Sequence, residues 1–270
     1  MTTEDDYKTT QFTAQGRTYT LRMSPKKHVY SYQEEGDEGW TRLPSVTTVG
    51  KSASGFDAST ALRWQRRLIG DALYANLNKT LDPGMVGACL NAADKSRDGA
   101  ADRGTFIHEQ AEALFRSIRD NHAFDLAPLD ELHAILAWAQ AWNVRPILVE
   151  QMVAHIDEGY AGTLDLLAYY TDPEDGDERI GLFDLKTGKG VYPQNFNQLS
   201  AYWNALEWQD AEALPEARFI LHLPEGADDV HVVKPTEEHA RDLTAFRTSQ
   251  FLYGYNADGA RAKKRGWPYR

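Results

Sequence analysis

The feature that most constrains the fold of this 270-residue chain is a change of hydrophobic period near its middle. Apolar side chains recur at every second position in three consecutive segments, Pro146–His155, Gly162–Tyr170 and Arg179–Thr187. Short polar turns join these segments, and on both sides of them the period returns to that of a helix. Because strand side chains alternate between two faces while helix side chains repeat every 3.6 residues, the pattern predicts three consecutive strands between helices.

Helical segments are expected on both sides of the three strands. Upstream, Ile107, Ala111, Leu114 and Ile118 recur at helical spacing and form one apolar stripe. The other expected elements are a helix at about 129–142, a helix at 194–206, strands at 217–223 and 230–234, and a helix at about 237–253. This order predicts an α/β (α+β) fold in which helices flank a central mixed β-sheet.

The first hundred residues carry shorter patterns. Residues 11–40 alternate polar and apolar positions, which predicts short antiparallel strands. Pro44–Gly50 (PSVTTVG) is a β-branched run. Two helical segments follow, at about 62–69 and at about 84–94, the second ending near Asp98-Gly99. We therefore expect an N-terminal decoration of β-hairpins and helices on the central fold.

The composition indicates the class of protein and the cellular compartment to expect. Its 42% hydrophobic and 26% charged residues are typical of a folded globular chain. The single cysteine, Cys89, excludes an internal disulfide and any cysteine-built zinc or iron–sulfur site. No apolar run approaches the roughly 20 residues of a membrane span, and the first ten residues (MTTEDDYKTT) are too acidic for a signal peptide. We expect a cytoplasmic protein without a membrane partner.

The third strand contains a carboxylate and an ammonium two positions apart. Asp184 and Lys186 share one face of that strand, while Phe183 and Leu185 point to the opposite face. An isolated aspartate and lysine at this spacing most often form a structural ion pair. A functional interpretation therefore needs support from the residues of the preceding strand.

Asp165 is the only charged residue between Ala161 and Thr171 in the preceding strand. A lone carboxylate in a buried strand is costly unless a cation meets it. Because the two strands are hairpin neighbours, we expect Asp165 to face Asp184. Converging carboxylates need a shared proton or a divalent cation, and hard oxygen ligands suit Mg²⁺ or Mn²⁺. Lys186 beside such an ion can orient a water or stabilise charge on a phosphoryl group.

Other polar residues lie at spacings that bring them toward these acids. Glu150 is the lone charge of the first strand. His108 and Glu112 are four residues apart on one helical face, although a histidine there is more often structural than a ligand. Gln198 and Tyr202 are also four residues apart, at the edge of an apolar stripe, where they can equally be rim residues.

The ordered series of these motifs carries a family resemblance. It consists of a helical G-x-x-x-H (Gly104 to His108), a strand G-x-x-D (Gly162 to Asp165), D-x-K (Asp184 and Lys186), and a helical Q-x-x-x-Y (Gln198 to Tyr202). This series resembles the RecB-like branch of the PD-(D/E)xK nuclease superfamily, including its phage-type exonucleases. The resemblance covers about residues 101–253 and implies a restriction-endonuclease-like core.

The resemblance implies a magnesium- or manganese-dependent DNA nuclease, most simply an exonuclease of phage or bacterial DNA recombination or repair. The implied metal ligands are His108, Asp165, Asp184 and the backbone carbonyl of Leu185, with Glu150 and Glu112 as weaker candidates. Lys186 would position the attacking water. Gln198 and Tyr202 would hold Lys186 or contact the DNA backbone. The domains expected on this basis are residues 1–100 as a candidate DNA-contacting subdomain, 101–255 as the nuclease core and 256–270 as a basic tail.

The sequence lacks two cofactor-binding motifs that some members of this branch carry. Several members of this branch carry four cysteines for an iron–sulfur cluster, which one cysteine excludes here. A Walker-type phosphate loop is also missing, since Thr187-Gly188-Lys189-Gly190 lacks the first glycine and the following helix. We therefore expect one or two Mg²⁺ or Mn²⁺ ions and no bound nucleotide. Any ATP-driven unwinding would come from another protein. The resemblance implies a helicase or a single-strand annealing protein as a candidate partner.

Contacts with DNA are expected from clustered basic residues. The candidates are Arg63, Arg66, Arg67, Lys189, Lys263, Lys264 and Arg265. The net charge of −11 argues against a nucleic-acid partner only at first sight. Twelve acids lie in residues 4–6, 34–38 and 172–178, and the rest of the chain carries 28 acids against 29 basic residues. The acidity is thus local, and we expect weak DNA binding that falls quickly with salt.

Rival functions stay open at the level of sequence. A nuclease fold can bind DNA or a partner without cutting it, and the same metal chemistry can hydrolyse a small phosphorylated substrate. The motif series can also be fortuitous in an interaction protein of a phage. Exonuclease and endonuclease action, strand polarity, strand preference and oligomeric state are not distinguished by the sequence.

Overall fold

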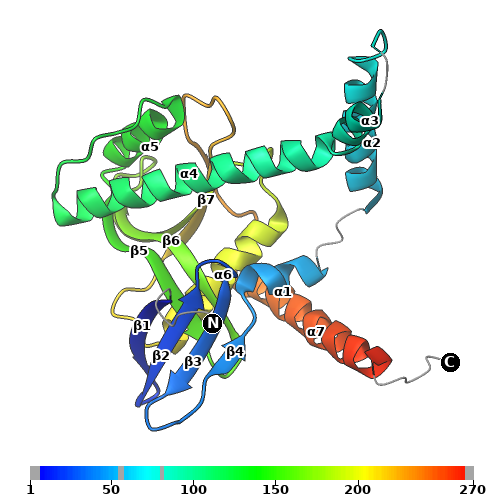
Figure 1. The fold of residues 1–270 in the computed structure, drawn as a ribbon. Helices are drawn as coiled ribbons and strands as arrows, with labels where there is room; N and C mark the ends of the chain where they lie inside the picture. The colour runs from blue at the N-terminus through cyan, green and yellow to red at the C-terminus, as the bar shows by residue number, and fades with distance from the viewer. Residues whose placement is uncertain (1–6, 54–57, 80–81, 265–270) are drawn as a thin grey trace. The chain divides into compact units, whose positions relative to one another are not determined.

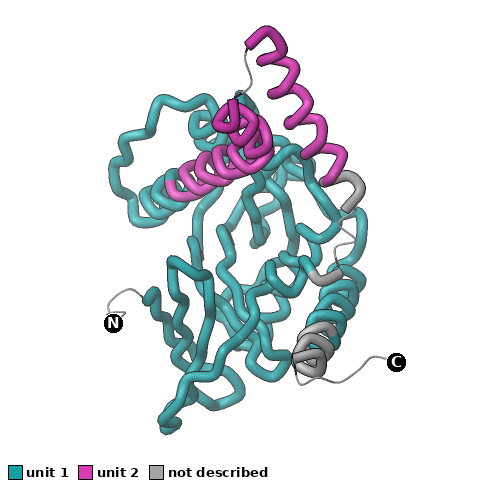
Figure 2. Tube along the Cα trace, turned by 45° about the vertical axis from the view of Figure 1, so that its right-hand side comes forward, with its two compact units in different colours: residues 1–54, 110–270 teal, residues 55–109 magenta. Residues whose placement is uncertain are grey.

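A computed structural model describes residues 7–53, 58–79 and 82–264. The chain forms two compact units, coloured separately in Figure 2. Unit 1 comprises residues 1–54 and 110–270, and unit 2 comprises residues 55–109. The division into domains at residue 100 stays a prediction, and the two units are described in turn below.

Unit 1 contains a five-stranded sheet in the order in which its strands occur in the chain (Figure 1). The strands are β5 (Arg145–His155), β6 (Tyr160–Thr171), β7 (Glu178–Lys186), β8 (Ala217–His222) and β9 (His231–Val233). The β7–β8 pair is parallel and the other pairs are antiparallel. The predicted mixed sheet with three leading strands is therefore confirmed, because period two and short polar turns are strong local signals.

Helices cover both faces of this sheet, as expected. α5 (Asp130–Ala141) places Trp138 against Phe183 of β7, with ring centroids 5.2 Å apart. α6 (Pro193–Trp208) and α7 (His239–Lys264) pack on the core cluster that contains Leu182, the neighbouring strand residue. Because adjacent strand residues point to opposite faces, α5 lies on one side and α6 on the other. The chain is thus an α+β protein with a helix-flanked mixed sheet.

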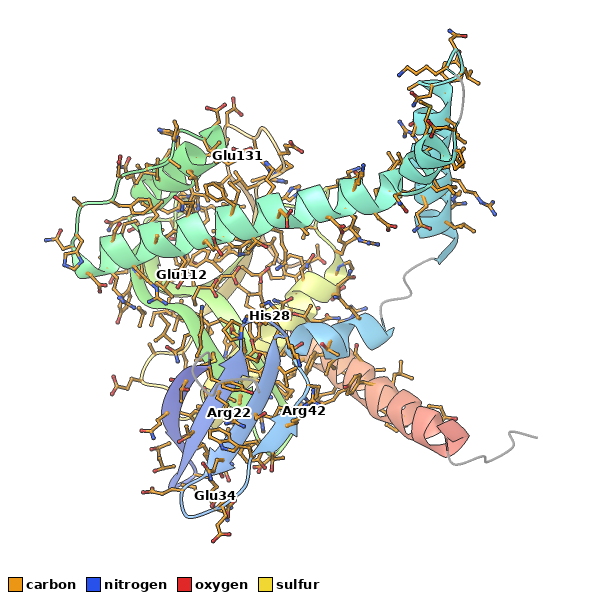
Figure 3. The ribbon with its side chains drawn as sticks, in the orientation of Figure 1. Arg22, His28, Glu34, Arg42, Glu112 and Glu131 are labelled. Atoms are coloured by element: carbon orange, nitrogen blue, oxygen red, sulfur yellow. The ribbon has the colours of Figure 1, made fainter. Side chains whose placement is uncertain are left out.

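The N-terminal strands form a second, fully antiparallel sheet in unit 1. Its strands are β1 (Lys8–Ala14), β2 (Arg17–Ser24), β3 (Val29–Glu34) and β4 (Thr41–Leu43). Leu21, Met23 and Tyr30 pack with Met152 and Ala154 of β5 in one hydrophobic cluster. Arg22 and Arg42 lie in one row across the opposite, outward face of the sheet (Figure 3). The predicted antiparallel strands are therefore confirmed, and they share a core with the central sheet.

The β-branched run after β4 forms a helix, α1 (Val46–Ala53). Ser45 starts it, because the Ser45 hydroxyl accepts a hydrogen bond from the Thr48 amide at 3.0 Å. Val46 and Val49, three residues apart, are fully buried in the core cluster with α6 and α7. Capping and burial of this pair outweigh the modest helix propensity of valine and threonine.

Unit 2 contains α2 (Ala58–Tyr74), α3 (Pro83–Leu90) and the first part of α4 (Ala92–Asp120). The expected end of a helix near Asp98-Gly99 was wrong, since α4 runs unbroken through both residues. The break falls at Asn91, where α3 ends, while Asp82 caps the start of α3. One glycine inside a helix of 29 residues costs only about 1 kcal/mol, which does not end the helix.

The long helices of the chain are polar. α4 has 29 residues and α7 has 26, and charged residues interrupt the apolar stretches of both. Over the described part of the chain, no helix combines the length and the apolar character that crossing a membrane requires.

Candidate functional site

Asp184 and Lys186 meet at the end of β7. The Lys186 Nζ lies 2.5 Å from the Asp184 Oδ2, and only 1% of the Asp184 side chain is exposed. Strand alternation predicts that they project together, and this is confirmed. Their burial beside a hydrophobic core gives a charged pair that bulk water screens little.

α6 supplies a second polar pair to this site. The Gln198 Nε2 donates to the Asp184 Oδ1 and to the Tyr202 hydroxyl, each at 3.1 Å. Both oxygens of Asp184 are therefore engaged, one by Lys186 and the other by Gln198. Tyr202 is buried, so the two residues are not simple rim residues of α6.

The glycine of the G-x-x-D motif makes room for this arrangement. A Cβ placed on Gly162 would lie 2.4 Å from the Tyr202 Cε1, closer than side-chain atoms approach. Because the Tyr202 ring is held in the core, it has little freedom to move aside. Gly162 thus allows α6 to approach β6 and bring Gln198 to Asp184.

Asp165 joins the site from β6. The β6–β7 ladder begins at Leu166 opposite Phe183, so Asp165 and Asp184 occupy the next positions along the two strands. The Asp165 Oδ2 accepts a hydrogen bond of 2.8 Å from the Leu185 amide. Asp165 therefore contacts β7 between Asp184 and Lys186. The metal role of the Leu185 carbonyl stays a prediction.

Glu150 lies opposite Asp165 on β5. Its neighbours Val149 and Gln151 pair with Leu166 and Leu164, which places Glu150 beside Asp165. Glu150 has a φ of 48°, in the left-handed region that a residue with a side chain rarely adopts within a strand. Such an irregularity locally redirects a side chain and is common beside functional sites.

Burial, together with the nearby carboxylates of Asp165 and Glu112, raises the pKa of Glu150 to about 8. Without a cation, Glu150 therefore holds a proton at neutral pH. Sequence reasoning ranked this residue second, because residue spacing does not reveal a left-handed backbone.

Three side chains of this region can together hold a metal ion. One ligand atom each from His108, Glu150 and Asp165 lies within 4.8 Å of the other two. An imidazole nitrogen and two carboxylate oxygens form a donor set suited to a divalent cation, with Mn²⁺ accepting both kinds of ligand. The boundary between the two units falls inside the continuous helix α4, so His108 is counted with unit 2.

Glu112 forms an ion pair within its own helix. Its Oε1 lies 2.7 Å from the Arg116 Nη2 on the next turn of α4. Glu112 still acts on the site electrostatically, since its charge contributes to the raised pKa of Glu150. Its expected role as a weaker metal ligand stays a prediction.

Lys186 and Tyr202 keep their protons. Burial alone would lower the pKa of Lys186, but the charges of Asp184, Asp165 and Glu150 outweigh it and raise that pKa above its usual value. Burial raises the pKa of Tyr202 well above its usual value. Lys186 is therefore an ammonium and Tyr202 a neutral phenol, which suits Lys186 to binding an anion rather than accepting a proton.

Four of the seven predicted DNA-contacting residues have side chains that the structure describes. Arg63, Arg66 and Arg67 are exposed on α2 of unit 2, where Arg67 pairs with Asp71. Lys189 is exposed in the loop that follows β7. The remaining three are Lys263 and Lys264, whose side chains lie outside the described residues, and Arg265, which lies outside them altogether.

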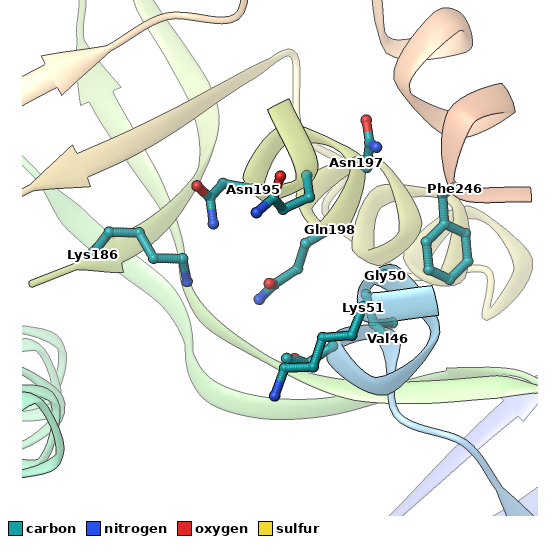
Figure 4. A pocket seen from close by; sticks show the side chains of 10 residues that line it. Val46, Gly50, Lys51, Lys186, Asn195, Asn197, Gln198 and Phe246 are labelled. Carbon is teal, nitrogen blue, oxygen red and sulfur yellow. The ribbon is translucent and has the colours of Figure 1, made fainter. Parts of the chain in front are cut away.

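Sequence reasoning missed a pocket beside Lys186 and Gln198, about 270 Å³ in volume (Figure 4). Lys51 of α1 also lines it. No pattern of spacing could have connected Lys51 with Lys186, because only the packing of α1 against α6 and α7 brings the two lysines to one pocket.

The described residues of unit 1 thus form one continuous polar site, from Glu150 through Asp165 and Asp184 to Lys186 and Gln198. Three strands and one helix contribute to it. In comparisons with known proteins, no family model and no curated sequence matches this chain.

Proposed function

We propose that this protein is a Mg²⁺- or Mn²⁺-dependent DNA nuclease with a PD-(D/E)xK-type site on a restriction-endonuclease-like core. The observation that carries this proposal is the contact series of Glu150, Asp165, Asp184 and Lys186 across three adjacent strands. The element order supports it, with three antiparallel strands followed by α6 and the parallel strand β8.

The proposed reaction is hydrolysis of a phosphodiester bond. A divalent cation held by His108, Glu150 and Asp165 would supply charge neutralisation at the phosphate and a more acidic bound water. Lys186 would aim its ammonium at the phosphate or the attacking water, and Asp184 would hold Lys186 in place. Gln198 would fix Asp184 in turn.

This assignment changes the expected roles of two acids. Glu150 moves from a weaker candidate into the ligand set, because its carboxylate shares the site with His108 and Asp165. The main role that we propose for Asp184 is to position Lys186. We also propose that Asp184 binds the metal ion, and this second role rests on the resemblance.

The test is cleavage of end-labelled linear DNA and closed-circular DNA, with Mg²⁺, Mn²⁺ or EDTA. We expect degradation of linear DNA that EDTA abolishes and that the Lys186→Gln variant lacks. Lys27→Gln is the matched control, because Lys27 is exposed in the turn after β2. An equally active Lys186→Gln variant would overturn the proposal.

The same experiment separates the rival functions. Cutting of closed circles makes the enzyme an endonuclease rather than an exonuclease. Binding of Mn²⁺ and DNA without any cleavage makes it a catalytically silent nuclease fold. A helicase partner is proposed because the sequence carries no phosphate loop of its own, and a single-strand annealing partner rests on the resemblance alone.

A further inference from the structure

The pocket beside Lys186 has a composition that the acid cluster does not explain. α1 and α6 contribute most of its walls, and we call it the α1–α6 pocket (Figure 4). Its polar lining consists of Thr47, Lys51, Lys186, Gln194, Asn195, Asn197 and Gln198. Among the described residues that line it, none is acidic. Lys51 and Lys186 bring two ammonium groups to the pocket, of which Lys186 also pairs with Asp184, and this basic lining favours an anionic ligand.

Lys51 is placed in this pocket by the packing of α1. Val46 and Val49 anchor one face of α1 in the core. Thr47, Gly50 and Lys51 are at positions i, i+3 and i+4, so they share another face, and all three line the pocket. The side chain of Lys51 is exposed, and in Figure 4 it lies below Gln198, while Lys186 lies to the left of both.

α6 forms the opposite wall with amide side chains. Gln194, Asn197 and Gln198 have the same i, i+3 and i+4 spacing on that helix. Gln198 donates hydrogen bonds to Asp184 and Tyr202. The Asn195 Oδ1 accepts a hydrogen bond from the Tyr192 amide. Amides offer both donors and acceptors, which is what the sugar and base of a nucleotide require.

We propose that the α1–α6 pocket binds one nucleotide of the substrate strand and that Lys51 positions it by contacting a phosphate next to the scissile one. Lys186 and Gln198 line this pocket and also contact Asp184, so a strand in the pocket continues directly to the acid cluster. Gln194 and Asn197 bind the sugar and base. This inference rests on the proposed nuclease function.

The size of the pocket fits this ligand. Its volume of about 270 Å³ lies just below the roughly 300–1,000 Å³ of pockets that hold drug-sized molecules. This volume is compatible with a ligand of about one nucleotide. The buried side chains of Val46 and Phe246 close its apolar side.

The first test measures binding without turnover. Deoxythymidine monophosphate is titrated in EDTA against the full-length wild type, Lys51→Gln, Lys51→Arg and the control Lys27→Gln. We expect Lys51→Gln to weaken binding about tenfold, in line with the loss of one charge-assisted hydrogen bond. Lys51→Arg should stay within about threefold, and Lys27→Gln should match the wild type. Equal binding by Lys51→Gln and the wild type would overturn the inference.

The second test uses steady-state cleavage of a labelled oligonucleotide. A positioning role predicts that Lys51→Gln raises KM about tenfold with little change in kcat, whereas Lys186→Gln lowers kcat. Asn197→Ala, which keeps both lysines, should also raise KM. An unchanged KM in both variants would overturn the inference and leave the nuclease function standing.

The two proposals fail in distinguishable ways. Lys51-dependent binding of the monophosphate by a protein that cleaves no DNA would keep the nucleotide pocket and overturn the nuclease function. Cleavage by the wild type without any binding of the monophosphate, and with full activity in Lys51→Gln, would do the reverse.

Discussion

Among single residues, Glu150 has the most unusual environment. It lies beside Asp165, close to Glu112, with a left-handed backbone and a pKa of about 8. Neighbouring carboxylates can all ionise at neutral pH only when a cation compensates them. A proton on Glu150 and a divalent cation are therefore alternatives at this site.

This competition makes metal binding dependent on pH. Below pH 8 an ion must displace the proton of Glu150, so we expect the affinity for Mn²⁺ to fall about tenfold per pH unit between pH 8 and 6.5. Calorimetric titration with Mn²⁺ measures this, together with the proton released on binding. The Glu150→Gln variant should bind Mn²⁺ weakly at every pH. Equal wild-type affinity at pH 6.5 and 8.5 would contradict the assignment.

Glu150 also affects the stability of the metal-free protein. Its pKa is raised in the folded state, so the folded chain binds more protons than the unfolded chain between about pH 4.5 and 8. The contribution of Glu150 to the free energy of unfolding is thus full below pH 4.5 and is lost as pH rises through about 8.

We therefore expect Glu150→Gln to be more stable than the wild type at pH 8 in EDTA, by an amount on the order of 1–4 kcal/mol. At pH 5 the two should differ little. Urea unfolding at both pH values measures the difference. A variant that is less stable than the wild type at pH 8 would show that Glu150 is not strained in the metal-free state.

Gly162 is the residue whose substitution tests the packing under the site. Gly162→Ala forces a Cβ against the Tyr202 ring, so we expect a loss of about 1–3 kcal/mol in the free energy of unfolding and reduced cleavage. Gly99→Ala is the control, because a Cβ there meets nothing within 4 Å and lies inside α4. It should leave stability equal or raise it by up to about 1 kcal/mol. Urea unfolding compares the two.

Among the elements, α6 links the sheet to the site. It is the crossover between the parallel strands β7 and β8, so its first turns come back along the end of β7 where Asp184 lies. Its buried face holds Leu199 and Leu206 in the core, while Gln198 reaches Asp184. The same helix thereby serves packing and positioning.

Removal of the Gln198 amide should impair the positioning of Asp184 by α6 without disturbing the packing of the helix. Gln198→Ala frees one oxygen of Asp184, so we expect kcat to fall at least tenfold while the affinity for Mn²⁺ stays within about threefold. Gln140→Ala on the exposed face of α5 is the matched control. Full activity of Gln198→Ala would show that α6 contributes packing alone.

At the scale of the whole molecule, the charge distribution is more balanced than the composition suggests. Arg179 pairs with Asp172 and Asp175 in the acidic turn before β7, and Arg145 pairs with Glu178. These two arginines offset part of the negative charge of that turn. The net charge of −11 does not concentrate in the α1–α6 pocket, whose charged lining is basic.

This distribution predicts how DNA binding responds to salt. Each phosphate neutralised on a single strand contributes about −0.7 to the slope of log K against log salt concentration. Lys51→Gln removes one such contact and should lower the magnitude of the slope by about 0.7. Binding of a labelled oligonucleotide in EDTA from 50 to 200 mM NaCl measures both slopes. A slope unchanged by Lys51→Gln would place the phosphate contacts elsewhere.

The sequence by itself determined the central sheet, its flanking helices and the pairing of Asp184 with Lys186. Period two, period 3.6 and turn chemistry are local properties, and they need no knowledge of distant residues. The end of the helix near Asp98-Gly99 was wrong for the same reason, because a local glycine signal was outweighed by the continuity of α4.

Only the tertiary structure decided how the site is assembled. The left-handed backbone of Glu150, the space that Gly162 leaves for Tyr202, and the entry of Lys51 into the pocket all depend on contacts between distant segments. Spacing along a chain fixes which face of an element a side chain occupies. Which faces then meet is decided by the burial of apolar surface over the whole molecule, which no local pattern contains.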